Sequence, residues 1–125
     1  MINSACAGSS RSIATGLLKV AEGANGTDAG QVFRNLLLSD KARADSIPEL
    51  EVLADEVKAA HGAPSSPVNP EQVHYLMSRG HSPQQAETLI VEGFLIDAFS
   101  TLSDSDLKDV LATRMTVHLE CELKR

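Results

Sequence analysis

Side chains that could bind a metal or carry out acid–base chemistry are thinly spread over these 125 residues, and His61 is the strongest candidate. An imidazole binds iron or zinc readily, and His61 stands in a His-Gly-Ala sequence just before a segment rich in proline and serine. A single histidine is not a metal site, so a partner would have to supply the other ligands. The alternative is a histidine that bonds backbone groups at a strand-to-helix junction.

Two further groups of side chains give weaker hypotheses. His118 and Cys121 are one helical turn apart and could face one metal ion, although ordinary packing on a helix surface explains them more simply. Carboxylates near His61 could act with it in a small metal-dependent hydrolase, although a solvated strand face explains them more simply. These carboxylates are Glu49, Glu51, Asp55 and Glu56.

Nucleophilic catalysis and phosphate binding lack their usual signatures in this sequence. Cys6 has no identifiable base or orienting group beside it. The glycine-containing segment 23–26 lacks the Gly-Lys-Ser/Thr ending of a P-loop, and its composition indicates a turn. We therefore expect that the chain is not an enzyme.

The composition indicates a globular protein that binds neither nucleic acid nor a membrane surface. Its net charge is −6, whereas binding to a phosphate backbone needs clustered lysine and arginine. No apolar run approaches the roughly 20 residues that span a bilayer. The N-terminus lacks the features of a secretory signal, and two cysteines are too few for a disulfide framework. We therefore expect a cytoplasmic protein.

Short apolar runs separated by turn residues fill the first half of the chain and predict strands. They follow a small, polar start, residues 1–10, which we expect to be flexible. No amphipathic helix separates the runs, so we expect a sandwich, a barrel or a β-helical stack. One alternative is that residues 36–38 form a short helix. The runs are 17–20, 32–38 and 47–53.

The hydrophobic period becomes that of an α-helix after the proline- and serine-rich segment. Asn69 is the expected N-cap of a first helix with Pro70 at its first position, and Gly80 ends it. Ser82 and Pro83 begin a second helix by the same logic. This pattern predicts helices that begin only after the last strand.

A third helix is expected after a cap at Ser103 or Asp104, and its apolar residues continue as far as Leu123. The predicted fold is therefore α+β. We place a strand domain at residues 11–64 and a three-helix domain at residues 65–125.

Several short segments occur in an order and at a spacing that together identify a family more specifically than any one segment does. They are Asn35–Asp40, Pro48–Val52, Asp55–Lys58, His61–Ala63, Glu71–Leu76, Ser78–Gly80 and Ala86–Phe94. Together they resemble the C-terminal part of the SufB/SufD family, the scaffolds of iron–sulfur cluster assembly. The similarity extends over roughly residues 11–105.

The resemblance implies the end of a right-handed parallel β-helix followed by a C-terminal helical domain. It implies that family members pair through their β-helices and that the helical domain docks on SufC, an ABC-type ATPase. It also implies that a nascent cluster forms between SufB and SufD, where the histidine of a His-Gly-Ala motif, here His61, is a shared ligand. The residues expected at the ATPase are Tyr75, Arg79, Gly80, Phe94 and Phe99.

Two positions depart from the SufB pattern. Ala42 stands where SufB has its cluster-forming cysteine, and Gly62 stands where SufB has a glutamate. The chain is therefore SufD-like, and we expect it to bind no cluster alone. It is also much shorter than full family members, which have N-terminal helices and a longer β-helix, so we expect a truncated product or a minimal paralogue.

We therefore expect a non-enzymatic component of iron–sulfur cluster assembly that binds a SufB-type scaffold and a SufC-type ATPase. The expected cofactor is an iron–sulfur cluster shared with the partner. The alternative is a stand-alone interaction module, a homodimer formed through β-helix edges, without cluster chemistry.

Overall fold

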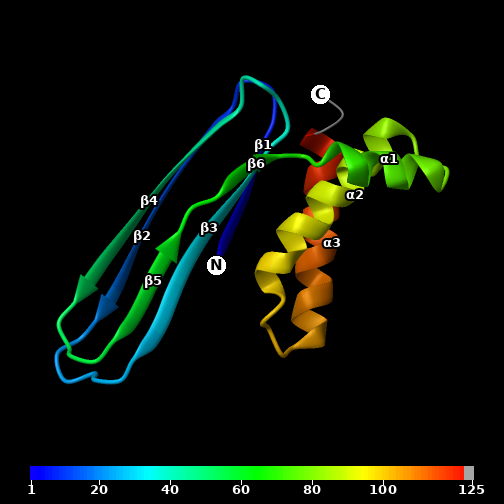
Figure 1. Ribbon diagram of the computed structural model, residues 1–125. Coiled ribbons are helices and arrows are strands. Elements are labelled where there is room, and N and C mark those ends of the chain that lie inside the picture. Colours follow the sequence, from blue (N-terminus) through cyan, green and yellow to red (C-terminus); the bar gives the residue numbers. More distant parts are fainter. Residues whose placement is uncertain (123–125) are drawn as a thin grey trace. The chain divides into compact units, whose positions relative to one another are not determined.

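A computed structural model describes residues 1–122 of the chain, which divides into two compact units, Met1–Ser66 and Pro67–Arg125. The first unit is built of strands and the second of helices (Figure 1), so the mixed α+β class is confirmed. Among the described residues, no helix is both long enough and apolar enough to cross a bilayer. The two units are described separately below.

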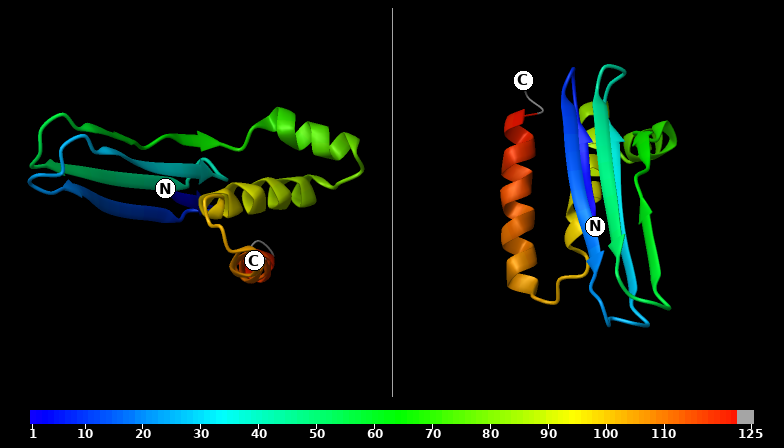
Figure 2. Two further views of the ribbon diagram at one scale, coloured as in Figure 1. Left: turned by 90° about the horizontal axis from the view of Figure 1, so that it is seen from below. Right: turned by 90° about the vertical axis from the view of Figure 1, so that its left-hand side faces the viewer.

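The strands of the first unit alternate between two sheets (Figures 1 and 2). β1, β3 and β5 form one sheet, in which β6 also pairs with β3, and β2 and β4 form the other. The pairs β1–β3, β2–β4 and β3–β5 are all parallel, so each strand lies beside the strand two places along the chain. The strands are β1 Ile2–Cys6, β2 Arg11–Val20, β3 Asp28–Leu37, β4 Arg43–Val52, β5 Lys58–Gly62 and β6 Ser65–Pro67.

The space between the two sheets is filled at its centre by Phe33, which is only 1% exposed. The ring reaches across to Gly16 on β2, where a Cβ atom would lie 2.7 Å from Phe33 Cζ. Gly16 is therefore the small residue that makes room for the largest buried side chain of this unit.

Asn35 is buried two residues further along the same face of β3. Its Nδ2 donates hydrogen bonds to Ser46 Oγ on β4 at 3.0 Å and to Ser65 Oγ on β6 at 3.1 Å. Its Oδ1 accepts one from Ser4 Oγ on β1 at 2.6 Å. One amide therefore links strands of both sheets, and it satisfies the polar atoms that its burial would otherwise leave unpaired.

Two expectations for this half are corrected, and a third segment proves to contain a strand. The first ten residues, which we expect to be flexible, include strand β1, Ile2–Cys6, which pairs with β3. Ser65–Pro67 is strand β6, so helical structure begins later than residue 65. The alternative of a helix at residues 36–38 is wrong, since β3 continues to Leu37. In each case pairing with distant strands decides the local conformation.

The second unit contains α1 (Pro70–Ser78), α2 (Pro83–Ile96), the 3₁₀ turn η1 (Asp97–Phe99) and α3 (Ser105–Glu122), and α3 runs back alongside α2 (Figure 1). Its centre lies on α2, where Ala86 and Val91 are almost fully buried. α3 contributes Leu119, which is also buried. This packing face supplies most of the helical stability, because helices of this length are marginal in isolation.

The expected starts of the three helices and the expected end of the first are confirmed, whereas Leu123, the last apolar residue expected on the third, lies outside the described residues. Asn69 Oδ1 accepts a hydrogen bond from Glu71 N at 2.9 Å, and Ser82 forms a reciprocal capping box with Gln85. Asp104, rather than Ser103, caps α3, since its carboxylate accepts from Leu107 N at 3.0 Å. Gly80 follows α1 with a φ of +98°, a backbone conformation that favours glycine.

The contact between Gly16 and Phe33 predicts the effect of one added methyl group. Gly16→Ala should lower the free energy of unfolding by about 1–3 kcal/mol, because its Cβ would overlap the buried ring. Gly30→Ala is the matched control, since a Cβ there meets only Ala60 O at 3.7 Å. It should change stability by less than about 1 kcal/mol. Urea denaturation followed by circular dichroism measures both, and equal losses would contradict the steric explanation.

The hydrogen bonds of Asn35 predict a second effect on stability. Asn35→Leu should cost about 1–3 kcal/mol, because the serine hydroxyls around it lose their partner. Ser65 is exposed, and Ser65→Ala removes only one of these hydrogen bonds, so this change should lower the free energy of unfolding by about 0.5–1.5 kcal/mol. The same denaturation experiment compares the two, and a smaller loss for Asn35→Leu would show that the amide does not organise the strands.

Candidate functional site

His61 lies on β5, in register with Gln31 of β3. Register partners in parallel strands point to the same side of a sheet, and alternate residues of one strand share a side. Gln31 is therefore on the side of Phe33 and Asn35, which faces β2 and β4, and His61 is on that side too. The His61 side chain is nevertheless exposed.

The exposure of His61 comes from its place at the last turn of the strand unit. Among the described strands, β4 pairs with β2 alone, and its inward-facing Leu50 and Val52 are 38% and 40% exposed. We call Leu50, Val52, Ala59 and His61 the open end of the strand unit. A histidine with apolar neighbours in an uncovered position is available to another molecule.

Gln31 fixes the strands beneath His61. Its Nε2 donates to Gly16 O at 3.2 Å and to Glu49 O at 2.8 Å, and so ties β3 to both strands of the other sheet. Our reading of the sequence missed this residue. The available signal is a glutamine that alternates with Phe33 and Asn35 on one face of a strand.

Within residues 1–122, the His61 side chain has no hydrogen-bond partner, so the alternative of a histidine bonded to backbone groups is not supported. The same residues contain no group of three or more histidine, cysteine or carboxylate side chains that could hold a metal ion. Glu51 is instead paired with Lys19, with Nζ and Oε1 2.9 Å apart. In the described part of the chain, the hydrolase hypothesis therefore has no assembled site.

Ala42, at the position of the SufB cysteine, is buried and stands immediately before β4. It lies near the opposite end of the strands from His61, because Gln31, the partner of His61, is six residues before the end of β3. That separation is on the order of 20 Å at the rise of a strand. The two positions therefore do not belong to one site within this chain.

Tyr75 and Arg79, two of the residues expected at the ATPase, form an exposed pair on α1. Arg79 Nη2 donates to Tyr75 Oη at 3.1 Å, and the guanidinium carbon lies 5.2 Å from the centre of the ring. The contact holds the arginine side chain against the helix surface. Its positive charge is thus presented in a defined place.

The structure does not bring all five expected docking residues together. Arg79 and Gly80 lie at the end of α1, just before α2 begins, whereas Phe94 and Phe99 lie at the far end of α2 and in η1. Pro83 and Phe94 are separated by about 16 Å along the helix axis. The five residues therefore form two groups at opposite ends of α2.

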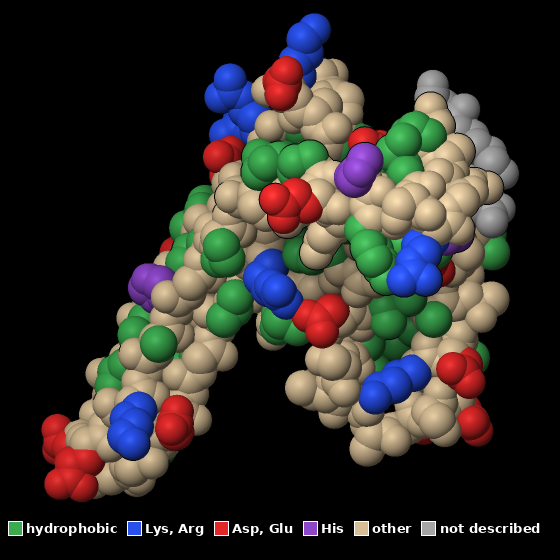
Figure 3. Space-filling model, turned by 45° about the vertical axis from the view of Figure 1, so that its right-hand side comes forward, with side chains coloured by type: hydrophobic (Ala, Val, Ile, Leu, Met, Phe, Trp, Pro, Cys, Tyr) green, Lys and Arg blue, Asp and Glu red, His purple; other side chains and the backbone are tan. Residues whose placement is uncertain are grey.

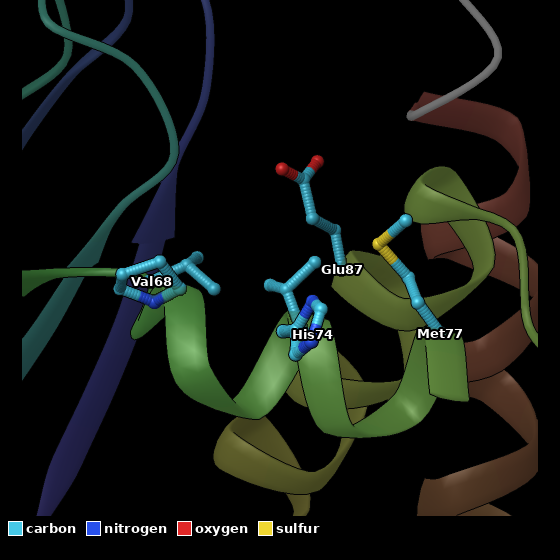
Figure 4. A pocket seen from close by; sticks show the side chains of 6 residues that line it. Val68, His74, Met77 and Glu87 are labelled. Carbon is cyan, nitrogen blue, oxygen red and sulfur yellow. The ribbon is translucent and has the colours of Figure 1, made fainter. Parts of the chain in front are cut away.

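Two hollows on the helical unit were not expected from the sequence. The first, of about 330 Å³, lies between α1 and α2. Figure 4 shows His74 and Met77 on α1, and Glu87 with its carboxylate turned away from the imidazole. The second, of about 430 Å³, is formed by α2, η1 and α3 and is lined by Phe99 among others. Both hollows depend on helix packing, which the sequence does not give directly.

The hypothesis of a metal between His118 and Cys121 is not addressed, because the Cys121 side chain lies outside the described residues. His118 is exposed on α3.

Comparison with known proteins gives a family match for most of the chain. Residues 1–94 match the model of the SufBD core domain of the SUF system for FeS cluster assembly. The chain is 37% identical to the iron–sulfur cluster assembly protein SufD of Escherichia coli (strain K12) over 105 residues, which are 84% of this chain and 25% of that protein. Identity to SufD of Bacillus subtilis (strain 168) is 40% over 105 residues, 84% of this chain and 24% of that protein.

An iron–sulfur cluster assembly SufBD family protein of Mycobacterium leprae (strain TN) is 39% identical over 101 residues, which are 80% of this chain and 25% of that protein. The chain thus spans about a quarter of the length of these relatives. The family match and the SufD relatives confirm the resemblance: the chain belongs to the SufB/SufD family, in which it is SufD-like and corresponds to the C-terminal portion.

Proposed function

We propose that the chain is a SufD-like, non-enzymatic component of iron–sulfur cluster assembly that contributes one ligand, His61, to a site completed by a partner. The observation that carries the proposal is the exposed His61 on the inward side of the open end, which also contains the uncovered Leu50 and Val52. The relatives' names assign them to iron–sulfur cluster assembly. A histidine that is exposed and can coordinate a metal, but has no other ligand beside it, fits a site that is shared with a partner.

The strand unit is, in this proposal, the end of a right-handed parallel β-helix. The parallel pairing of each strand with the strand two places along, and the alternation between two sheets, support this assignment. In such a stack each turn is covered by its neighbours. The last turn therefore presents unpaired backbone groups of β4 and apolar inward side chains to a partner.

A SufB-type scaffold is the proposed partner at the open end. Covering Leu50 and Val52 would remove apolar surface from water and place the partner's ligands near His61. Because Ala42 replaces the cysteine and is buried, the sulfur ligands would come from the partner. We propose that the chain alone binds no cofactor and that the cluster is shared.

A SufC-type ABC ATPase is the proposed partner of the helical unit. The Tyr75–Arg79 pair supports this role, since it offers a fixed positive charge to a carboxylate on the partner. A cytoplasmic location belongs to the same proposal, and rests on a cysteine content too low for a disulfide framework.

A stand-alone homodimer is the second candidate, and one observation favours it. The outward face of the β2–β4 sheet exposes Ile13, Leu17 and Ile47, with exposed fractions of 63%, 57% and 46%. Ion pairs flank this apolar strip at both ends, Arg11 with Asp45 and Lys19 with Glu51. Such a strip could pack against a second copy.

The role of His61 predicts a loss of cluster. When the chain is co-expressed with a SufB-type scaffold and a SufC-type ATPase, His61→Ala should lower the iron and sulfide bound to the purified complex at least twofold. The complex should still assemble, because the His61 side chain is exposed and has no hydrogen-bond partner within residues 1–122. His118→Ala, which removes another exposed histidine, is the control and should leave the cluster content unchanged. Equal iron and sulfide in both variants would exclude His61 from the site.

The position of the partner interface gives a separate prediction. Leu50→Glu should weaken binding of the SufB-type scaffold at least tenfold, because it places a charge in the covered apolar surface. Leu17→Glu changes an exposed leucine on the outward face, and should leave that binding unchanged. Calorimetric titration of each variant with the SufB-type scaffold measures the binding, and the mass of each variant in solution shows whether it is a dimer. The homodimer is supported instead if only Leu17→Glu converts a dimer to a monomer.

A further inference from the structure

The hollow formed by α2, η1 and α3 is lined by both apolar and charged side chains. Its volume is about 430 Å³. The apolar side chains that line it are Ile96, Phe99 and Ala112, and the carboxylates are those of Asp97 and Asp109. A hollow lined by both apolar and charged groups is a usual form of a pocket that receives an anchoring side chain of another protein.

The arrangement of charge at this hollow favours a basic partner. Lys108 Nζ donates to Ser100 O at 3.2 Å, so the lysine is held to the connection between η1 and α3. The Asp109 side chain has no partner within residues 1–122. Acidic residues also outnumber basic ones between residues 67 and 119: Glu71, Glu87, Glu92, Asp97, Asp104, Asp106 and Asp109 against Arg79, Lys108 and Arg114.

The hollow between α1 and α2 is the alternative place for an apolar anchor on the helical unit. It is the smaller of the two, with a volume of about 330 Å³. On the face seen in Figure 3, hydrophobic side chains gather over the helical unit with charged side chains around them. The α2–η1–α3 hollow is the larger of the two and keeps its carboxylates beside aliphatic and aromatic groups.

We propose that the α2–η1–α3 hollow is the socket in which the ATPase seats one aliphatic or aromatic side chain that is flanked by lysine or arginine. This inference rests on the proposed docking of the ATPase on the helical unit, and assigns it to a surface. The apolar side chain fills the hollow, and the flanking cation meets Asp109. Charge complementarity speeds the encounter, and burial of the anchor slows release.

Gly93 allows the socket to be closed without damage to the fold. It lines the hollow on α2, and a Cβ atom built there meets nothing within 4 Å in the described residues beyond its own neighbours and the backbone of its own helix. The first atom of a larger side chain therefore meets no steric conflict, and the rest of that side chain would extend into space that the hollow now leaves open. It would also replace glycine in a helix interior, which favours the helix.

The test is a titration of the SufC-type ATPase with the full chain. Gly93→Leu should raise the Kd at least tenfold, with an unchanged or higher melting temperature. Gln84→Leu places the same side chain at an exposed position of the same helix, outside both hollows, and should leave the Kd within twofold. Asp109→Lys should raise the Kd at least threefold and reduce its dependence on salt concentration.

The outcomes separate this inference from the function on which it rests. If the unaltered chain binds no ATPase, both are overturned. If it binds, and Gly93→Leu binds equally well, the socket is wrong and the partner stands. If the chain self-associates without the ATPase and Gly93→Leu abolishes that association, the occupant is a second copy and the socket for the ATPase is overturned.

Discussion

The Asn35 side-chain amide has to find its hydrogen bonds inside the protein, because its burial between the sheets removes it from water. It finds them on Ser4, Ser46 and Ser65, which belong to β1, β4 and β6. A shift of β3 by one residue would turn the amide outward and leave all three hydroxyls unmatched. Apolar contacts alone would tolerate such a shift more readily, so this polar cluster specifies the register of the strand unit.

The same register decides where His61 points. With Asn35 fixed inward, alternation along β3 also puts Phe33 and Gln31 inward. Phe33 needs Gly16 opposite its ring, and Gln31 bonds carbonyls of β2 and β4. Parallel pairing then transfers this orientation from Gln31 to His61 on β5. The exposed histidine of the open end is thus oriented by buried residues of the neighbouring strand.

Local signals in the sequence predict the helical half better than the strand half. Asn69, Pro70, Ser82 and Gly80 act within a few residues of themselves, so the helix ends can be inferred. β1 gives no such signal, since Asn3 and Ser4 are residue types typical of loops. They form a strand because they pair with Arg34 and Asn35 of β3. The sequence alone identifies His61 as the candidate ligand, both by its residue type and by its place in the motif that carries the family resemblance. Its inward orientation and the bracing by Gln31 depend on pairing thirty residues apart, which a single sequence does not reveal.

The geometry of the strand unit also constrains any chemistry assigned to it. His61 is exposed at the open end, whereas Ala42 is buried near the other end of the strands, on the order of 20 Å away. A cysteine at position 42 would therefore not create a complete site within this chain, because metal ligands must lie within about 2–2.5 Å of a common ion. In the proposed function, the missing ligands must come from a second polypeptide across the open end, where Leu50 and Val52 offer it an apolar seat. One partner would then complete both the ligand set and the stack of strands, since the molecule that covers the apolar residues also supplies the missing ligands.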